Sequence, residues 1–107
     1  MATSEAWQRA AINISTATTT TIITAATDEF FEIKKLFLWA SGAQGVTFLS
    51  QATTMCGQID MAAQSRFVLD SEDAIIWLRG LAVGDDFRIT TSAAVQLSGI
   101  VVFQITN

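Results

Sequence analysis

The most regular pattern in the chain is its last long apolar run, from Ala94 to Thr106. Apolar residues there alternate with small or polar ones at a period of two, and many of them are β-branched or aromatic, which is typical of a β-strand. One face of the predicted strand carries, on either side of Gly99, the apolar residues Val95, Leu97, Val101, Phe103 and Ile105. A strand of this length needs partners at both edges and a second sheet against its apolar face, so it predicts a layered β-protein.

A second long strand is predicted from Phe30 to Ala40, but its apolar residues fall on both faces. Phe31 and Ile33 precede the pair Lys34 and Lys35, and apolar residues of both parities follow that pair. Two explanations fit this pattern. Either the strand lies between two buried surfaces for part of its length, or a β-bulge near the lysines exchanges its faces.

Shorter stretches of similar character predict the remaining strands, which are Arg9–Ser15, an edge strand entered through the threonine run Thr16–Thr21, Val46–Gln51, Arg66–Asp70, Ala74–Gly80 and Phe87–Thr91. Residues 52–63 predict an irregular strand or loop. The turn from Ser41 to Gly45 contains two glycines, so we expect the strand after it to form a hairpin with the strand before it. About eight or nine short strands roughly ten residues apart, without a convincing helix, predict an all-β fold, an antiparallel β-sandwich or barrel.

The length of 107 residues is that of one domain. Residues 1–9 are mostly small and polar and predict a flexible N-terminal arm, so the sandwich domain would span residues 10–107. Trp7 interrupts the arm. It would either cap the end of the core or anchor the arm on a neighbouring protein, as aromatic side chains at interfaces do.

Composition narrows the possible partners. Half of the residues are hydrophobic and 15% are charged, against about 25% charged in an average soluble domain, so we expect some apolar surface to be covered by other subunits. The net charge of −4 and the absence of a basic stripe argue against nucleic acid, and the apolar runs are too short to span a membrane. The first residues do not resemble a signal peptide, and the single cysteine, Cys56, fits a reducing compartment such as the cytoplasm.

Catalytic and metal chemistry lack their usual groups. The chain has no histidine and one cysteine, which we interpret as a small buried hydrophobe, so a transition-metal site is not expected. A serine or threonine nucleophile would find only Lys34 or Lys35 as a base. Three carboxylate pairs fall in predicted turns: Asp28–Glu29, Glu72–Asp73 and Asp85–Asp86. We expect their side chains to be solvated, and a calcium-binding loop is the less favoured alternative. We therefore expect a protein that is not an enzyme and uses no cofactor.

Several of these stretches together carry a family resemblance that runs from about Ile12 onward. They are the threonine-rich opening strand, LFLWASGAQGVTFLS, the FVL and IIWLRG stretches, and the final AVQLSGIVVFQI, with glycines at 42, 45 and 99. In strand order and turn glycines the chain resembles the small capsid decoration, or cement, proteins of tailed bacteriophages. The resemblance implies a homotrimeric β-sandwich or jelly roll on the outside of the virion. It would be made in the host cytoplasm, bind the major capsid protein and stabilise the shell.

For such a protein we expect shell contacts from Trp7, Arg9 and the arm. We expect subunit contacts from an apolar row that includes Ile100 and Val102. The main alternative is a ligand-binding β-sandwich, either a sugar-binding module or the head of a phage fibre, and a tail or baseplate protein is a third possibility. A sugar-binding module would stack its ligand on exposed tryptophans, whereas the apolar strands around Trp39 and Trp77 indicate core packing for those two.

Overall fold

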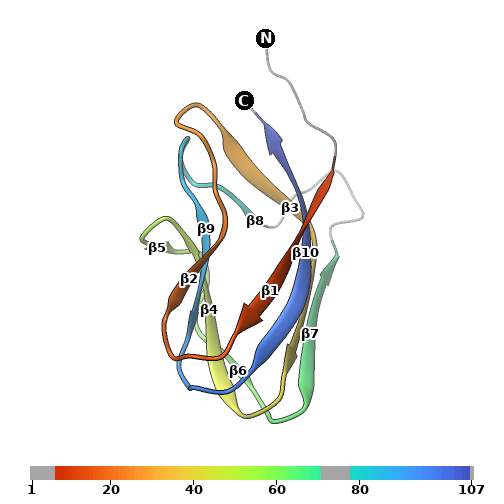
Figure 1. Cartoon of the computed structure of the whole chain (residues 1–107). Coiled ribbons are helices and arrows are strands. Elements are labelled where there is room, and N and C mark those ends of the chain that lie inside the picture. The colour runs from red at the N-terminus through yellow and green to blue at the C-terminus, as the bar shows by residue number, and fades with distance from the viewer. Residues whose placement is uncertain (1–6, 71–77, 107) are drawn as a thin grey trace.

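The computed structural model describes residues 7–70 and 78–106. Within these ranges the only regular secondary structure is β-strand, and the strands pack as two antiparallel sheets (Figure 1). The strands are β1 (Gln8–Ile14), β2 (Thr19–Ile23), β3 (Phe30–Ala40), β4 (Gln44–Ser50), β5 (Thr53–Thr54), β6 (Ile59–Met61), β7 (Ser65–Asp70), β8 (Leu78–Arg79), β9 (Phe87–Thr91) and β10 (Leu97–Thr106). The antiparallel β-sandwich predicted from the sequence is confirmed.

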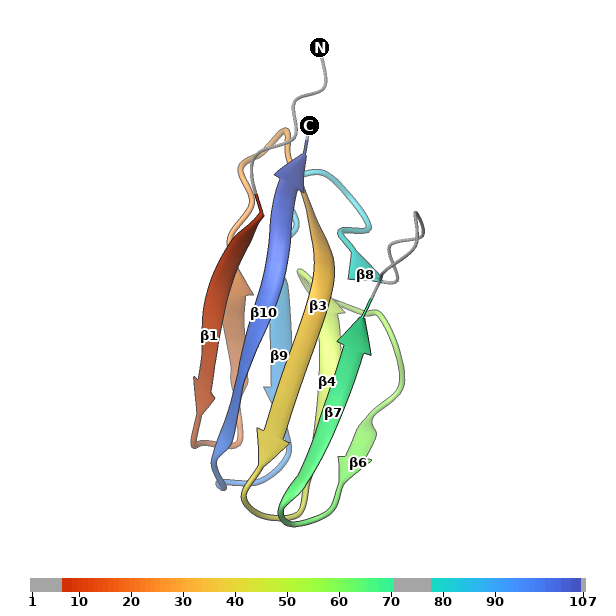
Figure 2. The same cartoon turned by 90° about the vertical axis from the view of Figure 1, so that its right-hand side faces the viewer.

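Strands that are far apart in the sequence lie side by side in each of the two sheets. The first sheet has the order β1-β10-β3-β7, with β8 also paired to β3. The second sheet has the order β2-β9-β4-β5, with β6 also paired to β4. The chain therefore crosses repeatedly between layers, and its first and last strands lie side by side, which gives the sandwich its jelly-roll-like order (Figure 2).

The hairpin expected between β3 and β4 is absent, and that prediction was wrong. The two strands belong to different sheets, so the turn between them spans the gap between the layers. The backbone N–H of Ser41 donates to the carbonyl oxygen of Gln96 at 3.0 Å, which ties the turn to the connection between β9 and β10. Crossing to the other sheet allows Val46 and Phe48 of β4 to enter the shared core, where both are buried.

A β-bulge at Lys34 explains the two-faced pattern of β3. Ile33 pairs with Phe103 of β10, but the next pair along is Lys35 with Val102, which leaves Lys34 as the extra residue. The inward-facing residues of β3 are therefore of odd number before the bulge and of even number after it: Phe31, Ile33, Leu36, Leu38 and Ala40. Of the two explanations offered by the sequence, the bulge is confirmed.

The core lies between the two sheets and is filled from both. Phe87 of β9 packs between two other rings, with its centroid 5.4 Å from that of Phe31 and 5.8 Å from that of Phe48. β10 contributes the predicted inward row of Leu97, Val101, Phe103 and Ile105, all of them buried. The row is interrupted at Gly99, where an added Cβ would collide with the backbone carbonyl oxygen of Phe37.

Several predicted segments fall partly outside the described residues. Of the predicted arm, residues 1–6 are not described, whereas Gln8 and Arg9 already form the start of β1, opposite Phe103 and Val102. Residues 71–77 are also outside, so the predictions for Trp77, for the Glu72–Asp73 pair and for most of the strand 74–80 are not addressed. The threonine-rich edge strand is present as β2.

Candidate interaction surface

The residues predicted to make contacts gather on the outer face of the first sheet. This outer face consists of the side chains of β1, β10, β3 and β7 that point away from the second sheet, and it faces the viewer in Figure 2. Cross-strand pairing arranges its central part in three level rows of four residues, one residue from each strand. We call them the upper, middle and lower rows, as they lie in Figure 2.

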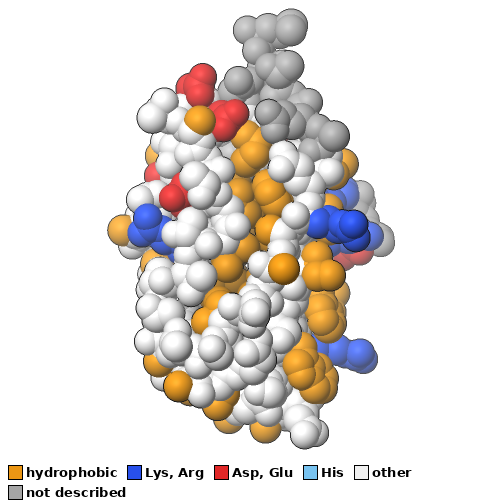
Figure 3. All heavy atoms as spheres, viewed as in Figure 1, with side chains coloured by type: hydrophobic (Ala, Val, Ile, Leu, Met, Phe, Trp, Pro, Cys, Tyr) orange, Lys and Arg blue, Asp and Glu red, His pale blue; other side chains and the backbone are white. Residues whose placement is uncertain are grey.

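The middle row is entirely apolar. Ala11 pairs with Ile100, Ile100 with Phe37, and Phe37 with Val68, so the row crosses all four strands. Its three large side chains lie partly in solvent: Ile100 is 48% exposed, Phe37 is 40% exposed and Val68 is 62% exposed. Figure 3, in which this face is seen edge-on at the right, shows hydrophobic side chains gathered there beside basic ones. A contiguous apolar strip of this kind is typical of an interaction surface.

The upper row is charged at both ends and holds two of the predicted contact residues. It runs from Arg9 through Val102 and Lys35 to Asp70. Lys35 Nζ lies 3.6 Å from Asp70 Oδ2, and because the lysine side chain is more than half exposed, this ion pair contributes little to stability. The row therefore places a cation at the β1 edge of the sheet and an anion at the β7 edge.

The lower row is polar apart from one large aromatic side chain. It runs from Asn13 through Ser98 and Trp39 to Arg66. The side-chain amide of Gln96 donates to Asn13 Oδ1 at 2.7 Å and to Ser98 Oγ at 3.1 Å, which fixes the β1 side of the row. Trp39 is 39% exposed, so the interpretation of this tryptophan as a core residue was wrong. The bulge at Lys34 is the reason, because it turns odd-numbered residues after it outward.

The predicted contact residues lie closer together than their predicted roles suggested. Arg9, assigned to the shell, is the direct cross-strand partner of Val102, assigned to the subunit interface, and Ile100 is in the adjacent row. A shallow hollow lined by Arg9, Ala10, Ala11 and Ile100 lies where β1 meets β10. Trp7 is exposed just before β1, and Lys34 Nζ lies 5.9 Å from the centroid of its ring.

Sequence reasoning missed Phe37 and Val68 as members of this surface. Their outward orientation follows from the bulge and from the register between β3 and β7. The exchange of parity across Lys34 and Lys35 was the only indication available in the sequence.

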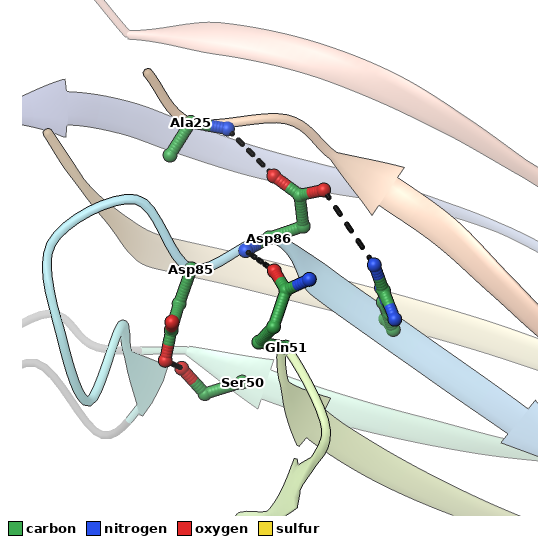
Figure 4. Close-up of polar contacts among 6 residues, drawn as sticks. Ala25, Ser50, Gln51, Asp85 and Asp86 are labelled. Atoms are coloured by element: carbon green, nitrogen blue, oxygen red, sulfur yellow. Dashed lines mark hydrogen bonds and ion pairs between the residues drawn. The ribbon is translucent and has the colours of Figure 1, made fainter. Parts of the chain in front are cut away.

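The adjacent carboxylates Asp85 and Asp86 have structural roles at one end of the sandwich (Figure 4). Asp85 Oδ2 accepts a hydrogen bond from Ser50 Oγ at 2.7 Å, and Asp86 Oδ1 accepts one from the backbone N–H of Ala25 at 3.0 Å. The Ser50 hydroxyl also accepts from the backbone N–H of Leu81 at 2.9 Å. The expectation of freely solvated turn residues was wrong for this pair, since both carboxylates are half-buried and hold loops together.

In the described residues, no group of three or more histidine, cysteine or acidic side chains is placed to hold a metal ion. Cys56 is a free, half-buried thiol packed against the core. Within residues 7–70 and 78–106, no helix long and apolar enough to cross a membrane is present.

The fold and this surface define a class of protein, a β-sandwich domain whose outer sheet face is apolar at its centre and carries charged residues at its edges. Comparison with models of known protein families gives no match to the chain, and a search of curated protein sequences finds no relative.

Proposed function

We propose that this protein is a structural component of a tailed-phage virion, a homotrimer that decorates the capsid exterior and stabilises it by binding the major capsid protein. The observation that carries the proposal is the middle row, which leaves Ile100, Phe37 and Val68 in solvent on one sheet face. Such a face is suited to binding protein. It offers no enclosed cavity for a small substrate.

Trimer formation supplies the physical logic of decoration. A trimer presents each shell-binding surface three times, so the second and third contacts form at a high effective concentration even when each contact is weak. A protein that binds the assembled shell and not its separated subunits stabilises the shell by mass action. These steps require binding and no chemical reaction. The paired carboxylates of Asp85 and Asp86 accept hydrogen bonds that hold loops together.

The resemblance to decoration proteins and the alternation of strands between two sheets also support the proposal. Jelly rolls are common among viral capsid and lectin domains, so the fold is compatible with a virion protein. This support is an analogy at the level of fold, because one fold hosts many functions.

The test has two parts, a mass measurement and a binding measurement. Light scattering after size exclusion should give three times the monomer mass, and the trimer should co-sediment with empty shells of the phage that encodes it. A truncated protein lacking residues 1–7 keeps β1 whole but lacks Trp7, and it should stay trimeric and lose shell binding. Failure of the full-length protein to bind the shells would overturn the decoration function. Unchanged binding by the truncated protein would remove Trp7 and the arm from the contact.

A second candidate function, a sugar-binding module, is favoured by the exposed indoles. Trp39 lies between Ser98 and Arg66 in the lower row, an arrangement of aromatic surface and polar groups that suits a stacked sugar ring. Tryptophan fluorescence decides between the two functions. A sugar-binding protein would show a saturable change on addition of polysaccharide, lost in Trp39→Ala, and a decoration protein would show none.

A further inference from the structure

We propose that the outer face of the first sheet lines the inside of a closed ring of three copies, with the three-fold axis parallel to the strands and β1 of one copy beside β7 of the next. This proposal rests on the homotrimer of the proposed function and names the surface that forms it. The occupant of the apolar face is thus a second and a third copy of this chain.

The two edges of the first sheet are placed to meet in such a ring. In the described residues one edge is β1, which pairs with β10, and the other consists of β7 and the short β8, which both pair with β3. At the level of the three rows that second edge is β7. A sheet face that turns toward a three-fold axis brings one edge of each copy next to the opposite edge of its neighbour. Here those edges are β1 and β7.

The charges along these two edges are complementary. Rotation about an axis parallel to the strands keeps each row level with the same row of the next copy. Arg9 then meets Asp70 in the upper row, and Ala11 meets Val68 in the middle row. In the lower row the uncharged Asn13 meets Arg66, so no row brings like charges together. Complementary rows of this kind favour one partner orientation over others.

Large apolar side chains would fill the centre of the ring. Ile100 and Phe37 are neighbours on the two central strands, β10 and β3, and both are exposed. Three copies direct these side chains toward the common axis, where they cover one another. The two large side chains at the middle of the sheet face are thereby removed from water, which favours association.

A competing arrangement makes a different pairing. Two copies packed face to face about a two-fold axis perpendicular to the strands exchange the upper and lower rows. Asp70 of one copy then meets Arg66 of the other, and Lys35 meets Trp39. Arg9 has no anionic partner in that dimer, so Arg9 and Arg66 distinguish the two arrangements.

Charge reversal tests the pairing in the purified protein. Arg9→Asp and Asp70→Arg should each weaken trimer formation at least tenfold by concentration-dependent light scattering, and the double variant should recover most of the loss. Arg66→Asp is the matched control and should leave the trimer intact. Loss of association in Arg66→Asp with none in Arg9→Asp would overturn the proposal in favour of the two-fold arrangement. Unchanged melting temperatures separate these effects from misfolding.

A disulfide tests the geometry directly. Ala11→Cys and Val68→Cys are combined in a Cys56→Ser background and oxidised. Within one copy these positions are three strands apart, about 14 Å at the usual strand spacing, which is too far for a disulfide. A closed ring of three should therefore give a covalent trimer on a non-reducing gel, and each single-cysteine variant should give none.

The remaining gel outcomes each overturn the closed ring of three. A band limited to dimer indicates a two-fold assembly, and a ladder of long polymers indicates an open one. A trimeric mass without any cross-link overturns this surface but leaves the homotrimer of the proposed function standing. A monomeric mass overturns the homotrimer as well, while binding to empty shells remains the separate test of decoration.

Discussion

Deletion of Lys34 would test whether the bulge in β3 determines which residues enter the core. The bulge is the point where the pairing of β3 with β10 shifts by one residue. Lys34 is the extra residue there, so its deletion leaves the pairs on both sides of it in one unbroken ladder, and every core residue of β3 keeps its face. Deletion of Phe37 instead shortens the regular part of the strand, so that one part of β3 must turn over.

The cost of deleting Phe37 can be worked out from the less damaging outcome. If β3 gives up its bulge, both of its ends keep their partners, but Leu36 turns toward solvent and Lys35 toward the core. Leu36 is 1% exposed, and the loss of its burial costs about 1.5–3 kcal/mol. Burial of the lysine charge adds to this cost. The free energy of unfolding of a domain is about 5–15 kcal/mol, so the Phe37 deletion should be strongly destabilising, whereas the Lys34 deletion should leave the protein folded.

The assay is urea denaturation followed by circular dichroism, with Lys34→Ala as the matched control. This substitution keeps the extra residue and removes a contact with the Trp7 ring at 5.9 Å, so it should cost less than about 1 kcal/mol. The Lys34 deletion should be about as stable as Lys34→Ala, and the Phe37 deletion should be much less stable than both. A Lys34 deletion as unstable as the Phe37 deletion would refute the reasoning, because it would mean that removal of the extra residue does not let the two halves of β3 keep their faces.

The remaining predictions concern other elements. Ser50→Ala should lower the free energy of unfolding by about 1–3 kcal/mol, measured by urea denaturation, because the partly buried Asp85 carboxylate and Leu81 N–H lose their hydrogen-bond partner. Gly99→Ala should cost about 1–3 kcal/mol in the same assay, since its Cβ meets the fixed carbonyl oxygen of Phe37. Ile100→Asp should abolish the trimer by light scattering, because its cross-strand neighbours are apolar. Val102→Asp, which has basic neighbours, should weaken the trimer less.

Alternation in the sequence was enough to predict most strands. The bounds of β3 and β9 coincide with the predicted stretches Phe30–Ala40 and Phe87–Thr91, because period-two patterns and flanking turns are local features. The predicted hairpin between β3 and β4 was wrong for a physical reason. A glycine-bearing turn permits the chain to reverse, but whether the next strand joins the same sheet or the facing one depends on packing between distant residues.

The interaction surface could be predicted only in part. Ile100 and Val102 followed from the alternation of the last strand, and both lie on the outer face. Phe37 and Trp39 could not be placed, because one extra residue at the bulge decides their side of the sheet. The charged ends of the upper row could not be predicted either, since Arg9 and Asp70 share that row only through the registers of β10 and β3.

The pairing of β1 with β10 has a consequence for how the chain folds during synthesis. β1 has its sheet partner in a strand that is translated about eighty residues later, and β3 also pairs with β10. The first sheet cannot close on the ribosome until β10 has emerged from the exit tunnel. Until then Ile12 and Ile14, which end up buried, remain on an unpaired strand. Folding of this sheet therefore waits for the synthesis of β10, and a nascent chain stalled before β10 would expose apolar strands to aggregation.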